Sequence, residues 1–214
     1  MHIHLLTKNN QSTIQKTLES IKACNPDSIL VADMGSQDKT IKICEDFGAQ
    51  IYRTPNLKRH EARNHLSKMS RLGWRMWIEP WEIMVKGHDV IQSQSGLSAY
   101  ATIIQDGFVT KDVRFWKTGE FVNPVFERLP PAAQEVDAVF YSLGNPHQDD
   151  IMTAIKQWES DAPMSPQPYY FHACQALAAG NFDEFLNLSD HYMLLETNKT
   201  CMSAIMNRYY YAMV

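Results

Sequence analysis

The sequence contains no apolar stretch close to the roughly 20 residues that a membrane-spanning helix needs. Its opening residues, MHIHLLTKNN, hold too short an apolar core for a secretory signal peptide. Its four cysteines are widely spaced and form no CxxC pair, so neither a zinc site nor a redox motif is expected. These absences predict a cytoplasmic protein without an integral membrane segment, with free and mostly buried thiols.

The chain also lacks a surplus of basic residues and any low-complexity segment. Its 214 residues include 20 Lys and Arg against 24 Asp and Glu, which gives a formal net charge of −4. A nucleic-acid-binding protein would present a basic face, so no nucleic-acid partner is expected. With 44% hydrophobic and 21% charged residues, the composition is typical of a globular protein of one good-sized domain plus a small appendage.

A regular alternation is present over the first 80 residues. Strands are expected at four short apolar runs: 3–7, 28–32, 49–54 and 74–78. The segments between them have helical spacing, and Ser12 and Gln15 are spaced as a capping box at the start of the first helix. This β-α-β-α-β-α-β order predicts parallel strands with right-handed crossovers and a ligand site at their carboxyl ends.

The alternation weakens after residue 84. Further strands are expected at 97–107, 108–117 and 137–143, the first two antiparallel around Gly107. From about Asp150 the pattern is helical, with two helices hinged at Gly180–Asn181. We therefore expect a catalytic-type domain over residues 1–150 and a helical tail over residues 151–214.

Four segments, in order, resemble family 2 glycosyltransferases, which have the GT-A fold. ADMGSQDKT resembles their VDxGSxDxT segment, HEARNHL their AARN segment, and IHLLTKNNQSTIQKTLESI their opening strand and helix. WRMWIEPWE stands where they carry WILWLDADE, and YYFHACQALAAGNFDEFL is similar to one tetratricopeptide-like hairpin. The resemblance implies an α/β fold of the GT-A type, with a mainly parallel central sheet that binds a nucleotide sugar, followed by a small α-helical tail.

The resemblance also implies a UDP-sugar donor and assigns residues to it. Asp33 would accept the N–H of the uracil ring, while Thr7 and Lys8 would line the base pocket. Arg63 would pair with diphosphate oxygens, which suit a guanidinium group. The residues alone leave other roles open: Asp33 and Asp38 as caps of the next helix, and Lys8 and Arg63 as surface cations.

In the resembling family, an Asp-x-Asp pair holds Mn²⁺ or Mg²⁺ against the diphosphate as a Lewis acid. Here Glu79, Pro80 and Trp81 occupy the three positions, followed by Glu82. Because tryptophan cannot coordinate a metal, Glu79 and Glu82 are the predicted ligands, with His147 as a third and Glu79 also near the nucleotide. Trp81 is predicted to line the sugar pocket. The alternative is a pair of exposed glutamates at a turn.

NPVFERL resembles a segment that reads RVHEQL in relatives, which makes Glu127 the predicted catalytic base, with Asp149 and Asp150 as alternatives. The predicted function is metal-dependent, inverting transfer of a sugar from a UDP-sugar to an unknown glycan, protein or small-molecule acceptor. The altered metal motif leaves a second hypothesis, a catalytically degenerate relative that binds a nucleotide or a protein. A dinucleotide-binding domain is disfavoured, because no G-x-G-x-x-G follows the first strand.

Overall fold

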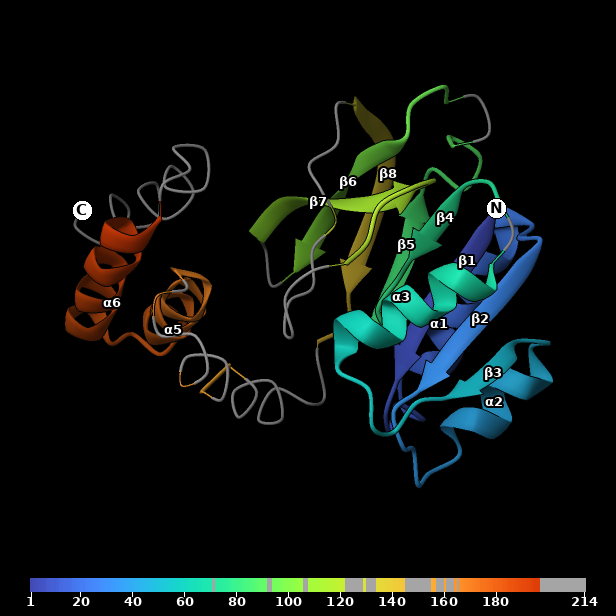
Figure 1. Ribbon diagram of the computed structural model, residues 1–214, viewed down its shortest axis with the longest axis horizontal. Coiled ribbons are helices and arrows are strands. Elements are labelled where there is room, and N and C mark those ends of the chain that lie inside the picture. The colour runs from blue at the N-terminus through green and yellow to red at the C-terminus, as the bar shows by residue number, and fades with distance from the viewer. Residues whose placement is uncertain are drawn as a thin grey trace. The chain divides into compact units, whose positions relative to one another are not determined.

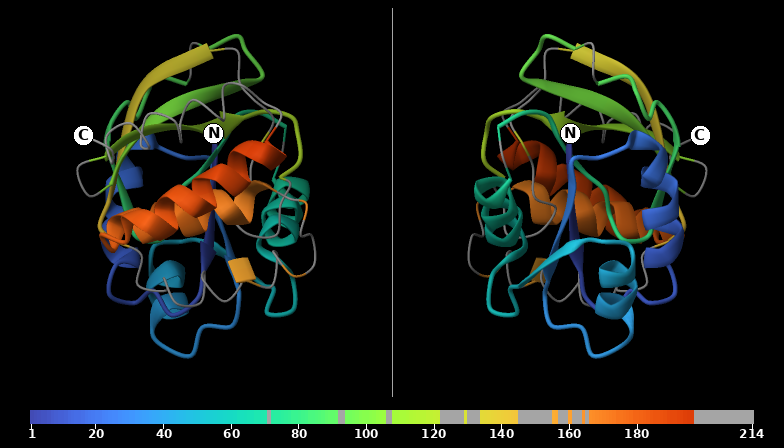
Figure 2. Two further views of the ribbon diagram at one scale, coloured as in Figure 1. Left: turned by 90° about the vertical axis from the view of Figure 1, so that its left-hand side faces the viewer. Right: turned by 90° about the vertical axis from the view of Figure 1, so that its right-hand side faces the viewer.

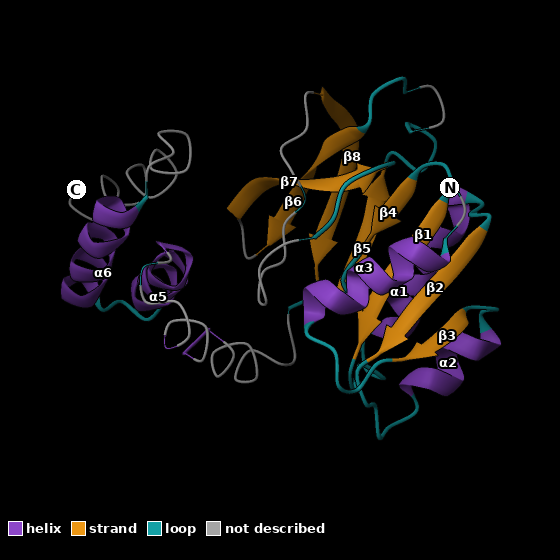
Figure 3. Cartoon of the chain, in the orientation of Figure 1, coloured by secondary structure: helices purple, strands orange, loops and turns teal. Residues whose placement is uncertain are grey.

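The computed structural model divides the chain into two compact units, Met1–His147 and Gln148–Val214. The residues that it describes are 1–70, 72–91, 94–105, 108–121, 129, 134–144, 155–156, 160, 164 and 166–196. The first unit is built around one sheet and the second contains a pair of helices (Figures 1 and 3).

The first half of the first unit alternates strands and helices. Its elements are β1 (His2–Thr7), α1 (Ile14–Ile21), the 3₁₀ turn η1 (Lys22–Cys24), β2 (Ser28–Asp33), α2 (Thr40–Asp46), β3 (Gln50–Arg53), α3 (Arg59–Met69) and β4 (Arg75–Trp77). β1 pairs in parallel with β2 and β4, and β2 pairs in parallel with β3. The predicted parallel strand–helix alternation is therefore confirmed.

The second half of this unit adds strands of both directions. They are β5 (Glu82–Lys86), β6 (Ser98–Gln105), β7 (Phe108–Trp116) and β8 (Gln134–Ser142). The eight strands run in the order β3-β2-β1-β4-β7-β6-β8-β5, with β7 antiparallel to β4 and β6, and β5 antiparallel to β8. The sheet is therefore mixed, and β5 is a strand that the sequence reading did not anticipate.

Helices cover both faces of the parallel strands (Figure 2). Ile3 and Leu5 of β1 pack in one cluster with the buried side of α1, whereas Leu6 packs with Ala62 and Leu66 of α3 in another. This is the period-two alternation of a strand that is buried on both faces. The two helical layers leave the ends of β1, β2 and β4 as the places where polar side chains gather.

The start of α1 differs from the sequence prediction. The helix begins at Ile14, and no side chain caps it. The backbone carbonyl of Asn10 instead accepts the N–H groups of Thr13 and Ile14 at 3.1 and 2.9 Å. The expected capping box is not formed, because the Gln15 amide donates to Glu19 within the helix.

Cys24, Cys44 and Cys174, the cysteines that the structure describes, form no disulfide. Cys24 and Cys44 are buried, and burial raises the pKa of Cys24 to about 11 and that of Cys44 to about 12. Neither thiol is therefore a nucleophile at neutral pH. Within the described part of the chain, no helix combines the length and the apolar character that crossing a bilayer requires.

The second unit contains a helical hairpin of α5 (Pro166–Ala178) and α6 (Phe182–Leu195). Gly180 has a φ of +73°, which favours glycine, and the Asn181 side chain accepts the N–H of Glu184 to cap α6. The predicted hinge at Gly180–Asn181 is thus confirmed. The hairpin is held by a cluster that includes Ala173, Ala176, Phe185 and Tyr192.

His4 is a buried polar residue at the centre of the sheet. Its ring meets the ring of Trp116 edge-on with centroids 5.3 Å apart, and neither ring nitrogen has a hydrogen-bond partner among the described residues. Burial, aided by the charges of Arg75, Arg63 and His2, lowers the pKa of His4 from 6.5 to about 3. His4 is therefore neutral in the folded protein at physiological pH.

We predict that His4 makes the protein sensitive to acid. Because its folded pKa lies below its unfolded value, the unfolded state binds the extra proton between about pH 3 and 6.5. The free energy of unfolding loses nothing to His4 above pH 6.5. On acidification below that pH, protonation of His4 in the unfolded state lowers this free energy by at most about 1.4 kcal/mol per pH unit. Urea unfolding of His4→Leu between pH 4.5 and 7.5 should show a smaller pH dependence than the wild type. Parallel curves for His4→Leu and wild type would contradict the prediction.

Candidate functional site

Several of the predicted site residues meet at the carboxyl edge of β2, β1 and β4. Thr7 ends β1 and lies in register with Asp33, which ends β2. Ile78 donates its N–H to the His4 carbonyl at 3.2 Å, so the next residue, Glu79, leaves β4 at the same edge. Thr7, Asp33 and Glu79 are all buried, and Lys8 beside them is exposed.

Asp33 fixes the turn that follows β2. One carboxylate oxygen accepts the N–H of Ser36 at 2.9 Å, and the other accepts from Arg53 at 3.3 Å. Gly35 has a φ of +100°, which lets the chain fold back to make the first of these bonds. The carboxylate is only 1% exposed, so it is pre-oriented by the turn and by Arg53.

The loops after β1 and β2 are cross-linked to each other. Asn9 donates its N–H to the Ser36 hydroxyl, and the Asn10 N–H reaches the Thr40 hydroxyl at 2.7 Å. Asp38 accepts the N–H groups of Thr40 and Gln11 at 2.9 and 3.1 Å, in line with the capping role expected at the start of α2. Burial raises the pKa of Asp38, but hydrogen bonds from Thr40 and Gln11 outweigh it and hold this pKa below its usual value.

The Glu-Pro-Trp-Glu stretch is a tight turn that joins β4 to β5. The Glu82 N–H donates to the Glu79 carbonyl, and the Glu79 N–H donates to the Glu82 carboxylate, both at 3.0 Å. Pro80 sits at the second position, where its fixed φ suits a β-turn. Trp81 is half-buried, and its carbonyl accepts the N–H of Leu143 at 2.7 Å. Its role in a sugar pocket remains a prediction.

Glu82 is not an exposed acid. It is 4% exposed, and both of its carboxylate oxygens accept hydrogen bonds from Arg114 of β7, at 2.7 and 2.8 Å. Burial raises the pKa of Glu82 against the charge of Arg114. The carboxylate therefore depends on this guanidinium group for its charge compensation.

Glu79 is also held by arginines, both from α3. Arg63 donates to its Oε1 at 2.6 Å and Arg59, one turn earlier, donates to the same oxygen at 3.0 Å. Arg63 is fully buried and forms an ion pair with Glu79, and its predicted contact with a diphosphate stays a prediction. Arg59, to which the sequence analysis gave no role, forms an ion pair with Glu79.

The ring of Trp77 lies against both ion pairs. The guanidinium carbon of Arg63 is 4.2 Å from the ring centroid and that of Arg114 is 3.7 Å from it. The indole N–H donates to the carbonyl of Val113 at 2.8 Å, which fixes the ring. Trp77 thereby links α3 and β7 through cation–π contacts.

A divalent ion does not fit the described carboxylates. Both oxygens of Glu82 are engaged by Arg114, and Oε1 of Glu79 is engaged by two guanidinium groups. Oε2 of Glu79 has no partner among the described residues, so these two carboxylates offer a divalent ion a single open oxygen. To bind Glu82, an ion would have to displace Arg114 and leave it buried and unpaired, at a cost of about 3–5 kcal/mol. No group of three potential metal-ligating side chains exists within the described residues.

These contacts do not favour Glu79 and Glu82 as ligands of Mn²⁺ or Mg²⁺, and that assignment stays a prediction. The predicted third ligand, His147, lies outside the described residues. The same holds for the predicted base Glu127 and for its alternatives Asp149 and Asp150.

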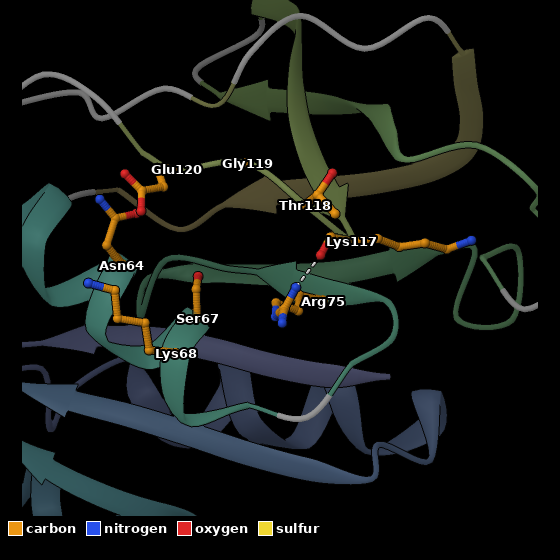
Figure 4. A pocket seen from close by; sticks show the side chains of 8 residues that line it. All are labelled: Asn64, Ser67, Lys68, Arg75, Lys117, Thr118, Gly119 and Glu120. Carbon is orange, nitrogen blue, oxygen red and sulfur yellow. Dashed lines mark hydrogen bonds between the residues drawn. The ribbon is translucent and has the colours of Figure 1, made fainter.

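A pocket of about 290 Å³ lies at the opposite end of β4, near Arg75 (Figure 4). Its lining residues are Asn64, Ser67, Lys68, Arg75, Lys117, Thr118, Gly119 and Glu120. Arg75 begins β4 and donates to the Ser70 hydroxyl at 2.7 Å and to the Lys117 carbonyl. None of the predicted site residues lines this pocket, so it is distinct from the edge where β4 ends.

No role was assigned to Arg114 or to Arg59 in the sequence analysis. Arg114 lies in the run Val113 to Trp116, whose members are all buried in β7. A charged residue inside an apolar strand run is a signal of a buried partner, since an unpaired buried charge is too costly. Arg59 stands four residues before Arg63, so the two share one face of α3.

Comparison with known families gives one match. Residues 3–78 match the family described as glycosyl transferase family 2. This segment covers β1 to β4 and stops just before Glu79, so it spans well under half of the 214 residues. No curated protein matches the sequence.

Two solved structures are similar to this chain at low sequence identity. S. aureus TarS is 12% identical, with a TM-score of 0.52 over 71% of this chain and 38% of TarS. The glucosyl-3-phosphoglycerate synthase of Mycobacterium tuberculosis, solved with Mn²⁺, UDP and phosphoglyceric acid, is 17% identical, with a TM-score of 0.40 over 50% of this chain and 43% of the synthase. The chain thus spans less than half of either protein. Its fold class is α/β of the GT-A type, as predicted.

We predict that the Glu82–Arg114 pair is essential for stability. Arg114→Met should lower the free energy of unfolding by about 3–5 kcal/mol, because Glu82 is left buried and unpaired. The control is Lys111→Met in the same strand, which removes the exposed pair with Glu135 and should cost less than about 1 kcal/mol. Urea unfolding at pH 7 measures both, and equal losses for the two variants would contradict the prediction.

Proposed function

We propose that this chain is a glycosyltransferase that binds a UDP-sugar at the carboxyl edge of β2, β1 and β4. The observation that carries the proposal is the alignment of Thr7 with Asp33 at this edge, beside Glu79 and its arginines. In open sheets of this kind, ligands bind outside the carboxyl ends of the parallel strands. The family match over residues 3–78 and the shared fold support the same reading.

The base-binding role falls to the two cross-linked loops. Asp33 would accept the N–H of the uracil ring, and its burial and fixed turn would make that acceptor pre-oriented. The Thr7 hydroxyl is buried without a partner among the described residues, so it would complete the base pocket. Lys8 is exposed at the rim, where its charge would meet the nucleotide.

The transfer step would be a direct displacement at the anomeric carbon. The acceptor hydroxyl oxygen forms the new bond to that carbon, the bond to the diphosphate oxygen breaks, and UDP leaves with the bonding electrons. Glu127 is the proposed base that takes the hydroxyl proton. Trp81 is the proposed wall of the sugar pocket, and the acceptor would be a glycan, a protein or a small molecule.

Four further predictions concern the metal, the helical tail, the cellular setting and nucleic acid. Binding of Mn²⁺ or Mg²⁺ by Glu79 and Glu82 is not carried into it, because these carboxylates do not fit the ion. We retain the tetratricopeptide-like character of the α5–α6 hairpin as a proposal. A cytoplasmic setting and the absence of a nucleic-acid partner also stay predictions.

One observation favours a second function, a non-catalytic module that binds a nucleotide or a protein. The acid that would have served a metal, Glu82, is committed to Arg114. A panel of UDP- and GDP-sugars separates the two hypotheses through release of free nucleotide, with thermal shift as the binding readout. Turnover of one donor supports the transferase, whereas binding without turnover supports the module.

We predict that Asp33→Asn weakens UDP binding by about tenfold or more, because the amide replaces a charged acceptor of the uracil N–H. The matched control is Asp46→Asn on α2, which removes an exposed pair with Lys42 and should leave the affinity unchanged. Isothermal titration with UDP and with uridine measures the effect, and both ligands should weaken to a similar degree. Unchanged uridine affinity in Asp33→Asn would refute the base-binding role.

A further inference from the structure

We infer that arginine side chains, with Arg59 foremost, take the place of the divalent ion at this edge, so that a nucleoside diphosphate binds here without a metal. The inference rests on the proposed function. It states which groups of the proposed site compensate the negative charge of the diphosphate. It follows from the disagreement between the metal that the family resemblance implies and the contacts of Glu79 and Glu82.

The first step is the position of the guanidinium groups. Where a metal-binding acid pair was expected, Arg63 and Arg59 converge on one oxygen of Glu79 at 2.6 and 3.0 Å. The positive charge that an ion would bring to the end of β4 is therefore already supplied by the chain. A divalent ion placed at Glu79 would face these two like charges at close range.

The second step is the order of burial along the network. Trp77 and Phe121 lie against Arg63, with ring centroids 4.2 and 5.5 Å from its guanidinium carbon. The buried Arg63 holds Glu79, and Glu79 holds Arg59, whose side chain is 24% exposed. Arg63 thus acts as a positioning residue, and Arg59 is the member of the network that a ligand in solvent can reach.

The third step is the chemistry of the group presented. A guanidinium fork matches phosphate oxygens bidentately and is more weakly hydrated than an ammonium, so it binds a diphosphate well at a partly buried site. As a fixed donor it also stabilises the negative charge that grows on a departing diphosphate. The second oxygen of Glu79 is buried without a partner among the described residues, and its acceptor capacity suits a hydroxyl group of the same ligand.

The test compares UDP with uridine by isothermal titration, in EDTA and in Mn²⁺. We expect the dissociation constant for UDP to differ by less than about threefold between the two conditions, since the charge is supplied by the protein. Arg59→Ala should weaken UDP by about tenfold or more in EDTA and leave uridine unchanged, because uridine has no diphosphate for this guanidinium group to bind. Arg59→Lys should restore part of the loss, because it keeps the charge but not the fork.

Two controls accompany these measurements. Lys42→Ala removes an exposed cation of α2 and should change neither affinity. Binding of Mn²⁺ alone, followed by electron paramagnetic resonance of the free ion, should be weak in the wild type and unaffected by Glu79→Gln.

The contrary outcomes are distinct. UDP binding that requires Mn²⁺, or Mn²⁺ binding that Glu79→Gln abolishes, overturns the inference and leaves the proposed transferase standing. An equal loss of UDP and uridine affinity in Arg59→Ala also overturns it, because Arg59 would then support the fold rather than the diphosphate. Failure of UDP to bind in either condition removes the inference and the proposed function together.

Discussion

The arrangement of the first unit depends on burying two carboxylates beside one indole ring. Glu79 and Glu82 leave water only because Arg63, Arg59 and Arg114 compensate their charge. Loss of one partner from a buried ion pair destabilises a protein far more than loss of a surface pair. These contacts therefore constrain the positions of the helix, the turn and the strand that carry the paired residues. They tie α3, the β4–β5 turn and β7 to one another, although these elements lie far apart in the sequence.

This constraint joins the two halves of the sheet. The run of parallel neighbours β3, β2, β1 and β4 ends at β4, and β7 continues the sheet antiparallel to it. Arg114 contacts the ring of Trp77 on β4 while it binds Glu82 at the start of β5. A shift of β7 by one residue would turn Arg114 to the other face and leave Glu82 uncompensated, so the ion pair specifies the register.

The parts predicted from the sequence were those with local signals. Apolar runs and helical spacing located β1 to β4 and the helices between them, and the position of Asp33 followed from the strand before it. The partnership of Glu82 with Arg114 spans 32 positions in the chain, and no local pattern encodes it. Comparison of the four-residue stretch with a motif predicted a metal ligand at Glu82 but did not predict the turn, which depends on Pro80 and two reciprocal hydrogen bonds.

The difference between a metal and a guanidinium group at this edge bears on how the site would behave. A bound ion contributes a double charge that depends on its concentration, and it retains coordinated water that a substrate can displace. Arg59 is covalently part of α3 and remains charged at every physiological pH. Its charge is single and oriented by Glu79, so it would favour a ligand whose phosphate oxygens meet the fork in one geometry. A site of this construction gains selectivity for the position of the diphosphate and loses the strong Lewis acidity of an ion.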